Sequence, residues 1–165
     1  MDFKEISIRG RFGYALLCIK SYIDFYELNS SIEENIFLNL STFTNTTQLD
    51  EWYEKCKVYD PTSYRNSINF SNINATEYSK LKTYYLKLPE NLFTLYQNAF
   101  DIAIEHLYSR VNSDITITYL EDSINILKRH SISIPKLKMD ILLSFNERNG
   151  WGLIYSWNKV FGDNK

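Results

Sequence analysis

The chain is poor in the residues that build metal centres, disulfides and phosphate loops. Its 165 residues include two cysteines, two histidines, five glycines and three prolines. His106 and His130 are far apart, and no cysteine or histidine pair has the short spacing of a zinc site. The glycines of Arg9–Gly13 lack the spacing and the preceding strand that a phosphate loop requires. The sequence therefore predicts no metal ligand, no cofactor and no catalytic motif.

The few cysteines and the lack of a long apolar run indicate a cytoplasmic protein. Cys18 and Cys56 fall on apolar faces of expected helices, where we expect reduced, inert core thiols. Charged residues interrupt the first ten positions, so no secretory signal is expected. The run Tyr14–Ile19 stops at Lys20, well short of a membrane span. We expect no membrane partner.

Charge is distributed unevenly along the chain. The net charge is −2, but residues 1–60 carry ten acids against six bases, and residues 128–165 carry three acids against seven bases. A general nucleic-acid binder would show a dominant basic field, so this class is not favoured. A basic partner that meets the acidic N-terminal part is one explanation, and pairing between the two ends of the chain is the other.

Hydrophobic and aromatic residues make up 44% and 16% of the chain, and their spacing predicts an all-α fold. Residues 89–110 contain no internal proline or glycine and carry apolar side chains on most sides, so we expect this helix to be central. We predict one compact domain over residues 1–165, a bundle of six or seven helices. The other expected helices begin near Ser7 or Arg9, at Ser30 or Ser31, at Thr47, at Asn74 and at Thr118.

Several segments leave the secondary structure open. Pro61–Asn74 is polar and is expected to be irregular, and Ile115–Ile117 fits a short extended stretch. The segment at 136–145 fits both an alternating strand and a helix. Because no second convincing strand is found to pair with it, we favour a short helix, with a minor extended segment as the alternative. The sequence Asn149–Gly152 predicts a turn that carries Trp151.

Candidate chemistry is limited to carboxylates and aromatic residues. Asp101 with Glu105, and Asp50 with Glu54, share helical faces, and such pairs serve acid–base catalysis when they are buried in a cleft. Solvated helix faces are the commoner explanation, and we favour it for Asp101 and Glu105. Aromatic residues beside acids are typical of a binding surface for a basic partner. The predicted partner-binding residues are Asp50, Glu51, Trp52, Glu54 and Trp151. The alternative is that Trp52 and Trp151 fill the core.

Four short stretches carry a resemblance to a known class of protein. They are Arg11–Cys18, which opens a helix, Leu49–Glu54, Tyr59–Pro61, and Phe145–Gly152 near the end. In this order the chain resembles small all-helical bacterial immunity proteins, which are encoded beside polymorphic or contact-dependent toxins. The likeness in layout covers most of the chain, and the aromatic and basic segment Leu153–Lys165 departs from it.

The resemblance implies a cytosolic, non-catalytic protein that binds and neutralises a cognate toxin domain. It supplies no binding residues, because immunity proteins contact their toxins through divergent surfaces. A helical adaptor with another partner is the alternative. A hydrolase is a further alternative, and it would require Asp101, Glu105 or His106 to converge with other acids in a deep pocket.

Overall fold

The computed structural model describes residues 2–68, 70–108, 113–136 and 143–161, and it confirms the all-α prediction over these residues. They form eight α-helices, six of which have seven or more residues, and no strand. The α-helices are α1 (Ile8–Phe25), α2 (Ser31–Ser41), α3 (Leu49–Cys56), α4 (Pro61–Arg65), α5 (Ala75–Lys87), α6 (Glu90–Ile104), α7 (Ser113–Arg129) and α8 (Trp157–Phe161). The 3₁₀ turns are η1 (Phe3–Glu5), η2 (Thr42–Thr44), η3 (Lys57–Tyr59) and η5 (Arg148–Gly150).

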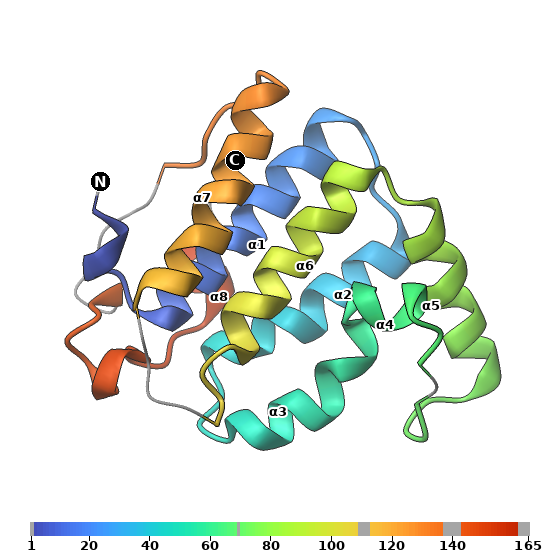
Figure 1. The fold of residues 1–165 in the computed structure, drawn as a ribbon, viewed down its shortest axis with the longest axis horizontal. Coiled ribbons are helices and arrows are strands. Elements are labelled where there is room, and N and C mark those ends of the chain that lie inside the picture. The colour runs from blue at the N-terminus through green and yellow to red at the C-terminus, as the bar shows by residue number, and fades with distance from the viewer. Residues whose placement is uncertain (1, 69, 109–112, 137–142, 162–165) are drawn as a thin grey trace.

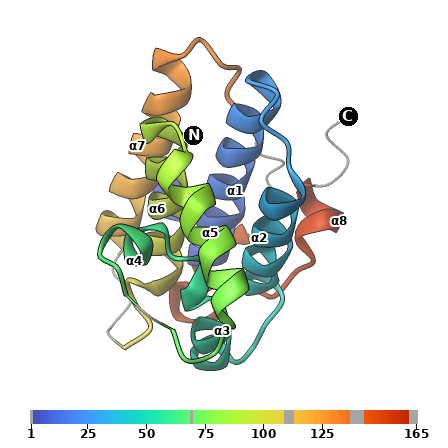
Figure 2. The ribbon, with the colours of Figure 1, turned by 90° about the vertical axis from the view of Figure 1, so that its right-hand side faces the viewer.

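Three helices form the middle of the molecule. α6 packs against both α1 and α7, and α1 also contacts α7 (Figure 1). Nine of the 15 residues of α6 are buried, which agrees with its predicted central place. In α1, 14 of 18 residues are buried, so this helix shares the centre. α5 lies at the periphery, with α2 beside it and α8 on the outer side of α2 (Figure 2).

Helix starts follow the sequence where a side chain caps the backbone. Ser30 Oγ accepts from the Glu33 N–H at 3.2 Å, and Asn74 Oδ1 accepts from the Glu77 N–H at 2.9 Å. Both contacts satisfy amide groups that a helix leaves unpaired at its first turn. The predicted cap at Thr47 is wrong, because α3 begins at Leu49 after Gln48, which makes no capping bond.

The predicted start at Thr118 is also wrong. α7 begins at Ser113 and runs through Ile115–Ile117, which we expected to be extended. Thr118 lies within the helix, where its hydroxyl donates to the Asp114 carbonyl at 3.3 Å. The β-branched residues are held in the helix by packing, since Thr116 and Ile117 are buried. Tertiary contacts thus override a weak local preference.

Two further boundaries differ from the prediction. α4 occupies the start of the segment expected to be irregular, because the Asp60 carboxylate accepts from the Thr62 N–H at 2.9 Å and Pro61 suits the first helical position. The apolar spacing of the first helix continues to Leu28, where we expected it to end, but α1 ends at Phe25. Glu27 takes φ 54°, and the Leu28 N–H bonds back to the Ile23 carbonyl at 3.0 Å, which closes the helix.

The two ends of the described chain meet. The Ser7 N–H donates to the Leu143 carbonyl at 2.6 Å and the Phe145 N–H donates to the Glu5 carbonyl at 2.8 Å, which makes an isolated antiparallel bridge. Residues 137–142 lie outside the described residues, so the choice between helix and strand for 136–145 stays a prediction there. The expected turn at Asn149–Gly152 is confirmed, with φ 93° at Gly150 and 80° at Gly152.

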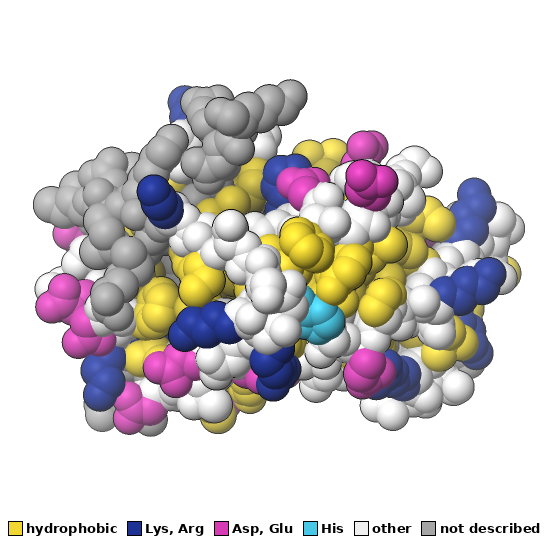
Figure 3. All heavy atoms as spheres, turned by 90° about the horizontal axis from the view of Figure 1, so that it is seen from above, with side chains coloured by type: hydrophobic (Ala, Val, Ile, Leu, Met, Phe, Trp, Pro, Cys, Tyr) yellow, Lys and Arg dark blue, Asp and Glu magenta, His cyan; other side chains and the backbone are white. Residues whose placement is uncertain are grey.

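Large hydrophobic side chains reach the surface at one end of the bundle. Figure 3 looks onto the end where α1 finishes and α6 begins, and hydrophobic side chains gather there. Phe25, Tyr26 and Leu28 are 54%, 41% and 37% exposed. No helix in the described part of the chain is both long and apolar enough to cross a membrane.

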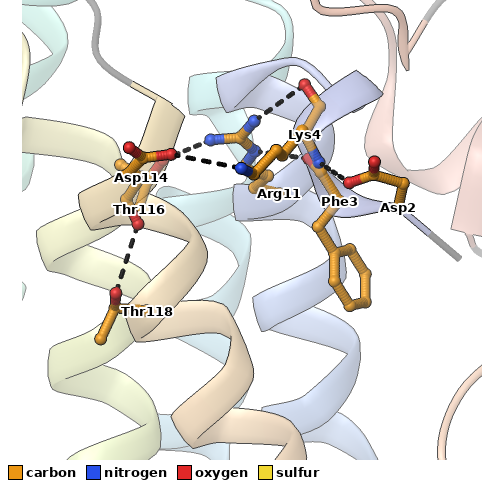
Figure 4. A network of polar contacts seen from close by, with 7 residues as sticks. All are labelled: Asp2, Phe3, Lys4, Arg11, Asp114, Thr116 and Thr118. Carbon is orange, nitrogen blue, oxygen red and sulfur yellow. Dashed lines mark hydrogen bonds and ion pairs between the residues drawn. The ribbon is translucent and has the colours of Figure 1, made fainter.

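Two arginines are buried in the first turns of α1, which the sequence did not predict. Arg11 is fully buried and donates to the carbonyls of Phe3 and Lys4 and to Thr116 Oγ1, the last at 2.7 Å (Figure 4). Burial lowers the pKa of Arg11 to about 10, and the nearby charge of Asp114 opposes this shift. The guanidinium therefore joins η1, α1 and α7.

Candidate protein-interaction site

The acidic residues singled out in the sequence line an open groove beside α3. The groove lies between α3, η3, the loop before α5 and the chain after α6, and has a volume of about 890 Å³. Its lining residues are Asp50, Glu51, Glu54, Lys55, Lys57, Val58, Tyr59, Ser71, Asn72, Ile73, Glu77 and Tyr108. Three of the five predicted binding residues therefore lie together on this surface.

The amphipathic pattern of α3 turns its acids outward. Asp50 and Glu51 occupy the first helical turn, where negative charge is stabilised by the helix dipole. The Gln48 amide donates to Glu51 Oε1 at 2.9 Å, and Asn72 on the opposite wall donates to the Glu54 carbonyl at 3.0 Å. The contact between Asn72 and Glu54 joins the two walls of the groove, whereas the contact between Gln48 and Glu51 lies within the wall formed by α3.

Trp52 lies on the other side of α3 and faces the core. Its side chain is 4% exposed, and its ring centroid lies 4.9 Å from Phe43 and 6.1 Å from both Phe12 and Phe100. A partner cannot reach this indole without opening the core. Trp52 therefore anchors the acidic helix, as in the core-filling alternative, and does not belong to the surface itself.

Trp151 is half-buried and does not line the groove. Its ring lies 6.3 Å from Phe43, and its carbonyl accepts the Arg9 N–H at 3.2 Å. The flanking glycines supply the positive φ angles that the turn requires. This turn covers the start of α1, so the core-filling interpretation of Trp151 fits the geometry better than partner binding.

The charge of the groove is acidic after internal pairing is counted. Lys57 Nζ lies 2.6 Å from Glu54 Oε2, and this contact neutralises one acid. Asp50, Glu51 and Glu77 then face one remaining lysine, Lys55. All four carboxylates of the lining keep contact with solvent, so they attract cations without an uncompensated cost of burial.

Tyr108 is the groove residue that sequence reasoning missed. It is 82% exposed, because α6 ends at Ile104 and the chain turns away from the bundle before residue 108. The sequence signal that could have identified this residue is a tyrosine placed directly after the apolar stripe of the central helix ends. An exposed tyrosine beside acids has the composition of an interface hot spot.

Asp101 of α6 lies close enough to Asp60 and Glu105 for their charges to act on it. Within the described residues, no group of three or more histidine, cysteine or acidic side chains can hold a metal ion. Asp60 is engaged by Thr62 and Ser63, whose hydroxyls donate to it at 2.7 Å and 2.9 Å. Asp101 is half-buried and therefore not the fully solvated residue that we predicted. Desolvation first, then the charges of Asp60 and Glu105, raise its pKa to about 6.

Both cysteines are free and buried, as predicted. Burial raises the pKa of the Cys56 thiol to about 12 and raises that of Cys18 as well. A thiol with a raised pKa carries little thiolate at neutral pH, so neither residue has the character of a nucleophile.

Comparisons with protein-family models, with curated proteins and with solved structures find no match. The resemblance to immunity proteins therefore stays a prediction.

Proposed function

We propose that this protein is a non-catalytic immunity-type protein that binds a basic surface of a cognate toxin domain through the acidic groove. The observation that carries the proposal is the juxtaposition of Asp50, Glu51 and Glu77 with the exposed Tyr108. Neutralisation requires only that the bound protein covers the toxin's functional surface. No catalytic residue of the chain is needed for it.

The groove combines the two contributions that protein recognition uses. Its carboxylates accelerate encounter with a basic partner, because long-range attraction between opposite charges raises the association rate. Tyr108 offers a large ring and a hydroxyl that can be desolvated together at the centre of an interface. Ile73 provides a half-buried apolar patch between them.

The adaptor alternative uses the same groove with a different partner. The two functions predict the same effect of groove mutations on binding but differ in biological outcome. Only a toxin partner links binding to the survival of a cell that makes the toxin.

Co-expression with a candidate toxin domain from the neighbouring genes tests the proposal. We expect the wild-type protein to restore growth and to form a complex that is retained on size exclusion. Tyr108→Ala is expected to weaken the complex about tenfold or more, as for an interface hot spot. Glu51→Lys is expected to lower the association rate and the salt dependence of binding.

Glu121→Lys is the matched control, because Glu121 is an exposed acid of α7 that does not line the groove. It should leave both growth rescue and affinity unchanged. A failure of the wild-type protein to rescue growth or to bind the toxin would overturn the proposal. Full binding by the Tyr108 and Glu51 variants would reject this groove as the interface.

A further inference from the structure

A second groove lies on another part of the molecule, between α5 and the connection from α1 to α2. Its volume is about 510 Å³, which is in the range of small-molecule sites. Its floor is apolar and is made by Ile32, Leu88, Leu92 and the ring of Tyr84. The view of Figure 2 shows α5 and α2 side by side, with this connection above them.

The charged groups of this groove are of one sign. Lys80 and Lys87 line it, and none of the acidic residues that the structure describes does. The two lysines are seven positions apart on α5, which places them about 10 Å apart along the same helical face. Thr83 and Tyr84 lie between them on that face. In the described part of the chain, neither lysine forms an ion pair.

The backbone that ends α1 shapes the opposite wall. The positive φ of Glu27 and the bond from the Leu28 N–H to Ile23 turn the Leu28 side chain out of the helix, where it is 37% exposed beside the groove. A leucine left partly exposed above an apolar floor gains free energy when a hydrocarbon covers it. The groove thus offers apolar contact along its length and a cation at each end.

From this arrangement we infer that the groove binds an amphiphilic monocarboxylate of the fatty-acid class. The hydrocarbon chain lies over Leu28, Ile32 and Leu92, and the carboxylate contacts the ammonium group of Lys80 or Lys87. A volume of about 510 Å³ suits a discrete ligand of this size. The cationic ends select a carboxylate over an alcohol or an ammonium head group. This site does not depend on the proposed function.

Isothermal titration with dodecanoate, below its micelle concentration, tests the inference directly. We expect saturable binding with one ligand per chain. Dodecanol should bind more weakly, and dodecyltrimethylammonium should bind least, because the head group alone differs in its attraction to the lysines. In the series octanoate, decanoate and dodecanoate, each added methylene should tighten binding by up to about fourfold until the groove is filled.

Variants locate the site. Lys80→Glu and Lys87→Glu should each weaken dodecanoate binding about three- to fivefold, the effect expected for a solvent-exposed ion pair. Thr83→Trp places an indole in the groove from an exposed position of α5 and should abolish binding. Lys159→Glu, an exposed lysine of α8 outside the groove, is the control and should bind as the wild type does.

Three results would overturn the inference. The first is no saturable binding of dodecanoate. The second is equal binding of all three head groups, which indicates adsorption as by a detergent. The third is binding of the protein to phosphatidylglycerol vesicles without binding of monomeric dodecanoate, which would identify a membrane-contact surface. Circular dichroism of each variant confirms that a loss of binding is not a loss of fold.

Discussion

At the scale of single residues, the least expected feature is the burial of two cations in α1. Arg9 is 3% exposed, donates to the Thr46 carbonyl at 2.7 Å, and lies over the ring of Phe43 at 5.7 Å. Its Nε has no partner among the described residues. A buried guanidinium is tolerated because its donors reach backbone carbonyls, and its burial lowers its pKa. Sequence alone does not supply these carbonyls, since they come from distant segments.

Burial shifts the pKa of Asp101 in the opposite direction from the pKa values of Arg9 and Arg11. Its ordinary pKa of 3.8 is raised to about 6, first by desolvation and then by Asp60 and Glu105. The folded state therefore holds the Asp101 proton more tightly than the unfolded state does. Between about pH 4 and pH 6 the folded state carries more protons, so the stability contributed by this group falls as the pH rises.

Asp101→Asn is expected to stabilise the protein at pH 7.5 and to have little effect at pH 4. The amide removes the charge that the half-buried site disfavours, while its oxygen can still accept a hydrogen bond. We expect a gain of about 1 kcal/mol in the free energy of unfolding at pH 7.5, because solvent screens this partly exposed group. Urea unfolding at several pH values measures it.

Glu121→Gln provides the control for this titration, because Glu121 is an exposed acid in the middle of α7, away from both helix ends. It should shift stability little at either pH. An Asp101→Asn variant that is less stable than the wild type at pH 7.5 would show that the ionised carboxylate is favoured by the fold, contrary to the argument from desolvation.

At the scale of elements, the start of α1 shows how a tertiary contact selects a residue that disfavours a helix. A Cβ atom at Gly10 would lie 2.6 Å from Ile6 Cγ2 and 3.3 Å from Leu143 Cβ. Ile6 and Leu143 belong to the segments of the antiparallel bridge, so the glycine lets this bridge approach the helix. The sequence alone does not show which segments approach the helix at this glycine, because both are distant from it or outside the helix.

Gly10→Ala is therefore expected to destabilise the protein, although alanine is favoured over glycine in a helix by about 1 kcal/mol. Overpacking against Ile6 should cost more than this gain, with a net loss of about 1–2 kcal/mol. The loss should shrink when Gly10→Ala is made in an Ile6→Ala background, where the clashing methyl is absent. A double-mutant cycle from urea unfolding measures the coupling.

The same cycle distinguishes the clash from a general effect on the helix. An equal cost of Gly10→Ala in both backgrounds would contradict the proposed contact. Leu17→Ala is the control substitution within α1. Leu17 is buried, but none of its atoms is among those nearest to a Cβ at Gly10. Its cost should add to that of Gly10→Ala without coupling.

Helices were predictable where local patterns and caps agree. Ser30 and Asn74 cap helices as expected, because the side chain and its amide partner are three residues apart. The α7 start was missed because Thr116 and Ile117 owe their helical state to burial against other elements. The candidate site was predictable only for Asp50, Glu51 and Glu54, which share one helix. Tyr108 and Glu77 join them through the fold.

At the scale of the whole molecule, the end of the described chain packs back onto its beginning. The Tyr155 hydroxyl donates to the Arg9 carbonyl at 2.7 Å, and the Tyr155 N–H donates to the Thr44 carbonyl at 2.9 Å. The Trp157 indole N–H donates to the Gly13 carbonyl at 3.2 Å. We expected an aromatic tail in this region, and these two rings are in fact part of the core, each 6% exposed.

Because the two ends of the described chain pack together, contacts between residues that are very distant in sequence contribute to the stability of the fold. Trp157 also packs edge-on against Phe37 of α2, with ring centroids 4.8 Å apart. The C-terminal segment thus links α1 and α2, the helices joined by the connection that borders the apolar groove. Loss of this link is expected to loosen both helices, because the Trp157 side chain contacts each of them.

Trp157→Ala is accordingly expected to cost about 3–5 kcal/mol in the free energy of unfolding, the range for deleting a buried aromatic side chain. Trp157→Phe keeps a ring against Phe37 but removes the donor to Gly13, and should cost about 1–3 kcal/mol. Val160→Ala, a half-buried neighbour on α8, is the control and should cost about 1 kcal/mol or less. Urea unfolding followed by near-ultraviolet circular dichroism measures the three variants. If Trp157→Ala costs no more than Val160→Ala, the C-terminal segment does not close the core, and α1 is held by its other neighbours, chiefly α6 and α7.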